Sequence, residues 1–153
     1  MINAFRIVRT VHAEDAFNGE GARLQGGRWN APGHAVVYTA ESIALATLEL
    51  LVNLTDSKNV KQYSVIECLF PEGVFEHVDR SLLPDDWFTY PPPAMLQQIG
   101  NQWLIERASA VLAVPSAIIP TELNYLLNPE HPDFRSVEIG VPRPFRLDLR
   151  LLT

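Results

Sequence analysis

The sequence predicts an α+β fold, with one compact domain built on a mixed, mostly antiparallel sheet. Strand-like and helix-like segments follow one another in no strict strand–helix–strand order, which disfavours a regular parallel sheet. The composition is that of an ordinary globular protein, with 47% hydrophobic and 20% charged residues. A chain of 153 residues is long enough to bury roughly two thirds of its unfolded surface in one core. We therefore expect residues 1–153 to form a single domain.

The N-terminal segments predict a strand, a long loop and a second strand. Residues 4–9 alternate well enough for a strand that carries Arg6 on the face away from the core, either outward or into a cleft. Residues 13–35 are rich in glycine and predict a long irregular loop, and loops of such length are more often functional than idle. Residues 35–39 predict a short strand that contains Tyr38.

A helix is predicted over residues 41–53, with Thr39 or Ser42 as its N-cap. Most of its positions are apolar, so we expect it to be mostly buried, with Glu49 on its one polar stripe. A buried carboxylate is costly unless it is paired or hydrogen-bonded, so Glu49 needs a partner or a water-filled cleft. Two interpretations stay open: an ion pair with an arginine that ties the loop to the helix, or a functional acid.

The second half of the chain predicts a further mixture of strands and helices. A segment with four prolines, residues 84–93, predicts a loop. The other predicted elements are strands over residues 63–70 and 74–79, a helix over residues 94–109, a strand over residues 110–120, a helical turn in residues 121–134 that ends at Pro129, and closing strands over residues 136–140 and 145–152.

The charge and the apolar segments exclude several classes of protein. A formal net charge of −6 argues against a surface that holds a nucleic-acid backbone. No apolar segment has the length of a membrane span, and the N-terminus lacks the pattern of a signal peptide. We therefore expect a cytoplasmic protein that contacts neither nucleic acid nor membrane directly.

Cysteine and histidine give no sign of a metal site. Cys68, the single cysteine, lies in a strand-like segment and is interpreted as a buried apolar thiol. The four histidines show no pair at metal-ligand spacing, so no metal is expected. His131 and Asn128 are expected to cap and brace a turn.

Three short motifs carry the remaining candidate residues. In "GGRWN" the glycines allow the backbone to approach a ligand closely, and the guanidinium of Arg28 can bind phosphate through two N–H groups. Paired glycines are also common in turns. Tyr38 offers either ordinary strand packing or an aromatic face for a flat ring. Ser116 in "VPSA" lacks the G-x-S-x-G elbow of a serine hydrolase, so a polar contact to a ligand is favoured over a nucleophile.

Taken together, "FRIVR", "FNGEGARLQGGRWNAPGHAVVYTAESIALATLELLV" and "VPSAIIPTELNYLLNPEHPDF" resemble the RES domain, the toxin half of bacterial RES–Xre toxin–antitoxin pairs. The family is named for an arginine, a glutamate and a serine, which correspond here to Arg28, Glu49 and Ser116. Arg6 and Tyr38 also match residues that line the family's pocket. The resemblance spans nearly the whole chain.

This resemblance implies a fold similar to the ADP-ribosyltransferases of the diphtheria-toxin kind and an activity that breaks down NAD+. NAD+ would be a consumed substrate and not a redox cofactor. The implied partners are an Xre-like antitoxin with a helix-turn-helix domain, which would cover the active site and bind the DNA, and a second copy of the chain. Residues 84–93 are the least family-like segment, and the resemblance gives them no role.

The residues can be given roles in that chemistry. Cleavage of the nicotinamide–ribose bond develops positive charge on the sugar, which a carboxylate such as Glu49 stabilises. The nicotinamide ring already carries a positive charge, so no general acid is required. Arg28 and Arg6 would hold the pyrophosphate or an attacking phosphate. Tyr38 would stack on nicotinamide or ribose, and Ser116 would hydrogen-bond the ribose or orient Glu49.

The acceptor and the reaction class stay open. Water would give ADP-ribose, inorganic phosphate would give its phosphorylated form, and a protein side chain would give ADP-ribosylation. A binding module without activity, in which Arg28 and Glu49 form only an ion pair, is the alternative from a different class.

Overall fold

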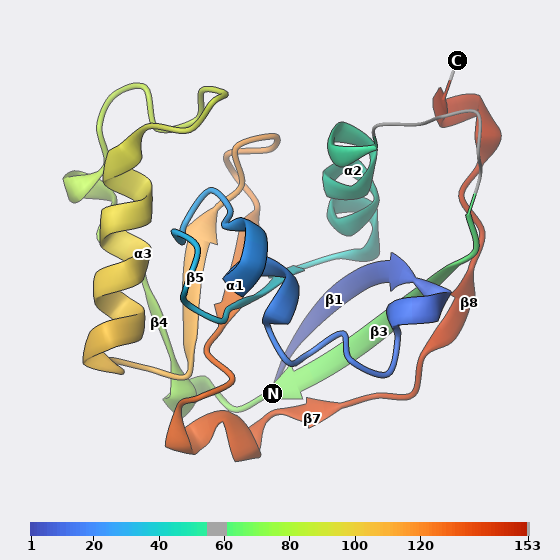
Figure 1. Cartoon of the computed structure of the whole chain (residues 1–153), viewed down its shortest axis with the longest axis horizontal. Helices are drawn as coiled ribbons and strands as arrows, with labels where there is room; N and C mark the ends of the chain where they lie inside the picture. The colour runs from blue at the N-terminus through green and yellow to red at the C-terminus, as the bar shows by residue number, and fades with distance from the viewer. Residues whose placement is uncertain (55–60, 153) are drawn as a thin grey trace.

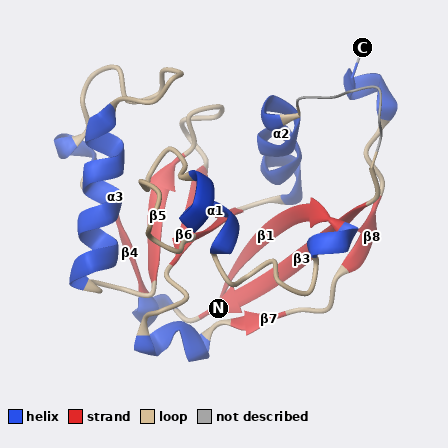
Figure 2. Ribbon diagram, in the orientation of Figure 1, coloured by secondary structure: helices blue, strands red, loops and turns tan. Residues whose placement is uncertain are grey.

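The computed structural model of the protein describes residues 1–54 and 61–152, and its core is one curled sheet (Figures 1 and 2). The described strands form an eight-stranded sheet in the order β4-β5-β6-β2-β1-β3-β7, and β8 also pairs with β3. The strands are β1 (Ile2–Arg9), β2 (Val37–Ala40), β3 (Tyr63–Phe70), β4 (Phe75–His77), β5 (Val111–Pro115), β6 (Leu123–Leu127), β7 (Glu138–Ile139) and β8 (Arg143–Phe145).

The pairing of these strands confirms the predicted fold class. β4 runs parallel to β5, while the other paired strands are antiparallel. The longest register joins β1 to β3, from Ile2 opposite Phe70 to Arg9 opposite Tyr63. The fold is therefore α+β with a mixed, mostly antiparallel sheet.

The described residues form three α-helices beside this sheet: α1 (Glu20–Gln25), α2 (Ile43–Asn53) and α3 (Ala94–Glu106). α3 packs beside β5 through Leu96, Trp103 and Leu104, and α2 lies over β1, as Figure 1 shows. Ser42 is the N-cap of α2, because its hydroxyl accepts a hydrogen bond from the backbone N–H of Leu45 at 3.0 Å. No helix among the described residues is long and apolar enough to cross a membrane.

Three predictions about the elements are wrong. Residues 121–134 contain β6 and not a helical turn, because β6 lies between β5 and β2 with Tyr125, Leu126 and Leu127 all buried. A strand covered on both faces loses the period-two alternation that identifies an exposed strand. The loop predicted over residues 13–35 includes α1, and residues 145–152 contribute only Phe145 to β8 before a 3₁₀ turn over Leu149–Leu152.

The expectation that α2 is mostly buried is also wrong. Only Leu45 and Ala46 are fully buried on this helix, and Val52 is 64% exposed. The small apolar cluster under α2 is completed by Phe5 and Ile7 of β1. The helix therefore covers one end of the sheet with one face and borders open space with the other.

Two local predictions are confirmed. The Cys68 thiol is fully buried, and burial raises its pKa to about 12. Asn128 and His131 brace a turn, because their side chains accept hydrogen bonds from the backbone N–H groups of Glu130 and Asp133 at 3.0 and 2.9 Å.

Gly100 is required where α3 meets the loop before β2. A Cβ atom at this position would lie 1.7 Å from the carbonyl oxygen of Trp29. We expect Gly100→Ala to lower the free energy of unfolding by roughly 3 kcal/mol, because the helix and loop would have to separate. Urea unfolding measures this, with Gly21→Ala in α1 as the control, since a Cβ on Gly21 meets nothing within 4 Å. An unchanged midpoint for Gly100→Ala would contradict the close packing of α3 on this loop.

Candidate functional site

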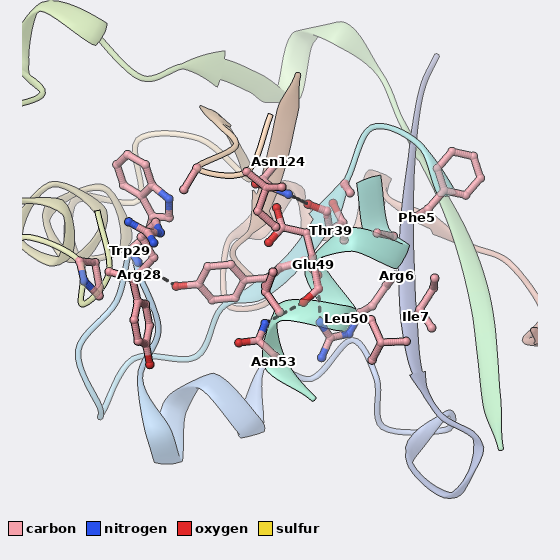
Figure 3. Close-up of a pocket in the computed structure, with 18 of the residues that line it drawn as sticks. Phe5, Arg6, Ile7, Arg28, Trp29, Thr39, Glu49, Leu50, Asn53 and Asn124 are labelled. Carbon is pink, nitrogen blue, oxygen red and sulfur yellow. Dashed lines mark hydrogen bonds between the residues drawn. The ribbon is translucent and has the colours of Figure 1, made fainter. Parts of the chain in front are cut away.

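A cavity with a volume of about 690 Å³ lies between α2, the strands β1, β2 and β6, and the loop before α3 (Figure 3). Four of the five residues singled out in the sequence line it, although they are far apart along the chain. Its lining residues are Phe5, Arg6, Ile7, Arg28, Trp29, Tyr38, Thr39, Ala40, Ala46, Glu49, Leu50, Val52, Asn53, Phe88, Tyr90, Pro92, Ala117, Ile118 and Asn124. The volume is within the range of pockets that bind small molecules, about 300–1,000 Å³.

Glu49 projects into this cavity from α2. Burial raises the pKa of its carboxyl, and the hydroxyl of Ser116, the side-chain amide of Asn124 and the positive charge of Arg28 act in the opposite direction. The net shift is upward, so burial outweighs the three groups that stabilise the charged form. The Glu49 carboxylate therefore has few contacts that stabilise its negative charge in the cavity.

Ser116 lies directly behind Glu49 and does not line the cavity. It is fully buried, and its hydroxyl donates to Glu49 Oε1 at 3.1 Å. The same oxygen accepts from the backbone N–H groups of Ile118 and Ile119 at 3.1 and 3.2 Å, which fix the direction of the hydroxyl. Of the two roles predicted for Ser116, this geometry favours orienting Glu49 over contact with a ribose.

Arg28 is bonded to the loop before α3 and not to Glu49. Its Nη1 donates to the carbonyl oxygens of Trp87 and Thr89 at 3.1 and 2.9 Å. Among the described residues, the ion pairs within 4.0 Å are Arg23–Glu20, His131–Asp133 and Arg150–Asp148. The Arg28–Glu49 contact on which the inactive-module interpretation depends is therefore absent from this part of the chain.

Arg6 points into the cleft and not outward. Its Nη1 donates to the carbonyl oxygen of Tyr38 at 2.9 Å, while its Nε is buried without a hydrogen-bond partner in the described chain. Burial lowers the pKa of this guanidinium. A buried cation with an unused donor is costly, and an anionic ligand would relieve that cost.

Tyr38 lines the cavity with its ring and holds the "GGRWN" loop with its hydroxyl. The hydroxyl donates to Asn30 Oδ1 at 2.6 Å and accepts from the backbone N–H of Trp29 at 3.0 Å. Burial raises the pKa of this phenol. A Cβ atom on Gly27 would lie 2.7 Å from the same hydroxyl, so the glycine lets the loop pack against Tyr38 and sets the position of Arg28.

Sequence reasoning missed Asn124 and the aromatic residues of the proline-rich loop. Asn124 is on β6, donates to the carbonyl oxygen of Thr39 at 3.2 Å and lies close to Glu49. The predicted helical turn in its segment does not place Asn124 on a strand that borders the cavity. Phe88 and Tyr90 line the cavity from a loop whose composition indicated only that it is a loop.

Comparison with known proteins identifies the family. The profile of the RES domain matches residues 3–148. The chain belongs to the RES domain family. Among its relatives in this family is a protein named Toxin Res from Yersinia enterocolitica, which is 37% identical over 148 residues that cover 96% of this chain and 97% of the relative.

Two further likenesses bear on chemistry and fold. A protein of Sphingobium named Prs ADP-ribosylating toxin is 36% identical, covering 94% of this RES domain chain and 91% of the relative. A solved structure of the M. tuberculosis MbcT–MbcA toxin–antitoxin complex contains a chain of similar fold, with a TM-score of 0.78 and 17% identity, covering 98% of this chain and 86% of that chain. This likeness shows that the two chains share a fold.

Ser116→Ala tests whether this serine controls the charge state of Glu49. The substitution removes a bond that favours the ionised carboxylate, so the pKa of Glu49 should move further upward. The free energy of unfolding should fall by about 1–3 kcal/mol, because the backbone donors of Ile118 and Ile119 lose their acceptor. Carboxyl NMR titration reads the pKa directly, and Ser136→Ala, at an exposed serine, is the control. An unshifted Glu49 titration would remove Ser116 from this role.

Proposed function

We propose that this RES domain protein is the toxin of a toxin–antitoxin pair and that it breaks down NAD+ by cleaving the nicotinamide–ribose bond. The observation that carries the proposal is the carboxylate of Glu49 on the cavity wall, which accepts a hydrogen bond from Ser116 and, among the described residues, forms no ion pair with an arginine. The names of the relatives support the toxin role and the use of an ADP-ribosyl donor.

Glu49 would act on the sugar end of the substrate. As the bond between C1′ and the nicotinamide nitrogen breaks, its electron pair goes to the nitrogen and neutralises the ring. Positive charge then develops on the ribose, where a nearby carboxylate stabilises it. The nucleophile forms the new bond to C1′ and releases its proton, which the Glu49 carboxylate or solvent accepts.

The two arginines would hold the diphosphate. Arg6 has a buried Nε without a partner, and among the described residues Arg28 uses only Nη1 for the loop carbonyls. The remaining N–H groups of both guanidinium groups suit phosphate oxygens, which form charge-assisted hydrogen bonds. Tyr38 would present its ring face to nicotinamide or ribose, because its hydroxyl is already used in the loop.

The acceptor divides this proposal into two reactions. Attack by water or by inorganic phosphate releases a small product, ADP-ribose or its phosphorylated form. Attack by a protein side chain is the second candidate function, and the Sphingobium relative named as an ADP-ribosylating toxin favours it. The same carboxylate, arginines and tyrosine serve both reactions, since the bond that breaks is the same.

The proposed partner is a cognate antitoxin of the Xre type, encoded beside this chain. The likeness to a chain of a toxin–antitoxin complex supports a partner of this class. The antitoxin would carry the DNA-binding surface, consistent with the net charge of −6 of this chain. A homodimer is proposed with it, on the family resemblance.

The deciding experiment incubates purified protein with NAD+, with and without inorganic phosphate, and identifies the products by mass. We expect free nicotinamide together with ADP-ribose or its phosphorylated form. Labelled NAD+ in a cell lysate distinguishes the second candidate, because ADP-ribosylation would leave label on a protein band. Intact NAD+ in every arm, with protein shown to be folded, would refute the proposal.

A further inference from the structure

The proline-rich loop, residues 84–93, presents two large aromatic rings to the solvent at the edge of the cavity. Phe88 is 53% exposed and Tyr90 is 88% exposed, and both line the cavity together with Pro92. Figure 1 shows this yellow-green segment projecting beyond α3 at the same end of the molecule as α2. Exposed aromatic surface that borders a cavity commonly marks a site of contact with a ligand or a partner.

The backbone of this loop is fixed although its rings are exposed. Arg28 Nη1 donates to the carbonyl oxygens of Trp87 and Thr89, on either side of Phe88. The Thr89 hydroxyl donates to the carbonyl oxygen of Asp86 at 3.0 Å. Trp87 packs against the apolar cluster beside α3 and meets the ring of Phe88 edge-on, with centroids 5.9 Å apart. The rings are therefore presented on a preorganised support, which reduces the entropy cost of binding.

Arg28 connects this loop to the proposed chemistry. It bonds the loop backbone on one side, and its charge acts on the carboxyl of Glu49 on the other. A dinucleotide with its diphosphate beside Arg28 would extend one ring system toward Glu49 and the other toward Phe88 and Tyr90. Under the proposed function, nicotinamide lies at Glu49, so the ring at the loop is the purine.

We propose that Phe88 and Tyr90 form the binding wall for the purine ring of the substrate, and that they set the preference for a dinucleotide over a mononucleotide. This inference rests on the proposed function for the orientation of NAD+. A purine stacks on aromatic faces through its π surface, and the loss of one such contact weakens binding about 10- to 100-fold. The loop thereby acts on substrate binding and not on the bond that breaks.

The test compares Phe88→Ala, Tyr90→Ala and the double variant with the parent protein on NAD+ and on nicotinamide mononucleotide, which lacks the adenylate. We expect KM for NAD+ to rise about 10- to 100-fold with little change in kcat, and KM for the mononucleotide to stay unchanged. Tyr90→Phe and Phe88→Tyr keep a ring and should raise KM for NAD+ less than the alanine variants do. Leu82→Ala, an exposed apolar residue that does not line the cavity, is the control.

Calorimetric titration with AMP supplies a readout that needs no turnover. AMP should bind the parent and the ring-retaining variants and should bind the double alanine variant about 10- to 100-fold more weakly. If the parent consumes NAD+ but the alanine variants keep its KM and its affinity for AMP, the purine wall is refuted and the proposed function stands. If the parent leaves NAD+ intact, the proposed function fails, and the AMP titration still tests whether Phe88 and Tyr90 bind the purine. Equal losses on NAD+ and the mononucleotide would also overturn the inference.

Discussion

Glu49→Gln is expected to reduce NAD+ consumption by about 10²–10³-fold while the protein stays folded. The amide keeps the size of the side chain, and its oxygen can still accept the hydrogen bond from Ser116. It removes the negative charge that faces the developing positive charge on the ribose. Product formation from NAD+, measured by mass at saturating substrate, gives the ratio of kcat values, and binding of AMP reports whether the cavity is intact.

The stability of Glu49→Gln should respond to pH with a defined sign. Burial raises the folded pKa of Glu49 above its ordinary value of 4.5, so the folded protein binds this proton more tightly than the unfolded chain. The parent's free energy of unfolding therefore decreases as the pH rises from 4.5 through the folded pKa. Glu49→Gln lacks this cost, so relative to the parent it should gain stability between acidic and neutral pH. Activity of the parent should rise through the same interval as Glu49 ionises.

Glu41→Gln is the matched control, because Glu41 precedes the same helix but does not line the cavity. Its carboxylate accepts a hydrogen bond from the backbone N–H of Leu123 at 2.8 Å and holds a structural contact. Its activity should remain close to that of the parent. Parental turnover in a folded Glu49→Gln protein would remove Glu49 from the chemistry.

The sequence identified Glu49 because helical periodicity isolates a single acid among apolar positions. The same periodicity did not identify its support. Ser116 bonds to Glu49 across 67 positions of the chain, a separation that no spacing rule covers, and only the family resemblance connected the two. Strand alternation puts Arg6 on the face of β1 opposite Phe5 and Ile7, but that face also carries Ala4 of the core, so it is not the face away from the core. Alternation alone does not distinguish a solvent face from a cleft.

Asn124 and the proline-rich loop show two further limits of sequence reasoning. The strand of Asn124 is covered on both faces, so its apolar run resembles a buried helical turn. The prolines of residues 84–93 correctly predicted a loop. What fixes that loop is a pair of backbone carbonyls bonded by Arg28, and every residue has such a carbonyl, so side-chain identity does not encode the contact.

Arg28→Ala is expected to lower kcat/KM for NAD+ by about 10²–10³-fold, through three losses that act together. The diphosphate loses a charge-assisted donor. The carbonyl oxygens of Trp87 and Thr89 lose the N–H that holds the loop, so the wall of Phe88 and Tyr90 is no longer fixed. The positive charge that opposes the upward shift of the Glu49 pKa disappears, so that pKa should rise further and the acid limb of the pH profile should move to higher pH.

Arg28→Lys separates these losses, because it keeps the charge but replaces the planar fork with one ammonium nitrogen. This variant should keep the acid limb of the pH profile near that of the parent. Its single nitrogen cannot bind the loop and the diphosphate through separate N–H-bearing atoms, as Arg28 can. Its kcat/KM should therefore fall between those of the parent and Arg28→Ala. Arg23→Ala, which removes an arginine paired with Glu20 outside the cavity, should leave kcat/KM unchanged. Equal activity of Arg28→Ala and Arg23→Ala would mean that neither the loop contact of Arg28 nor a contact to the diphosphate contributes to the reaction.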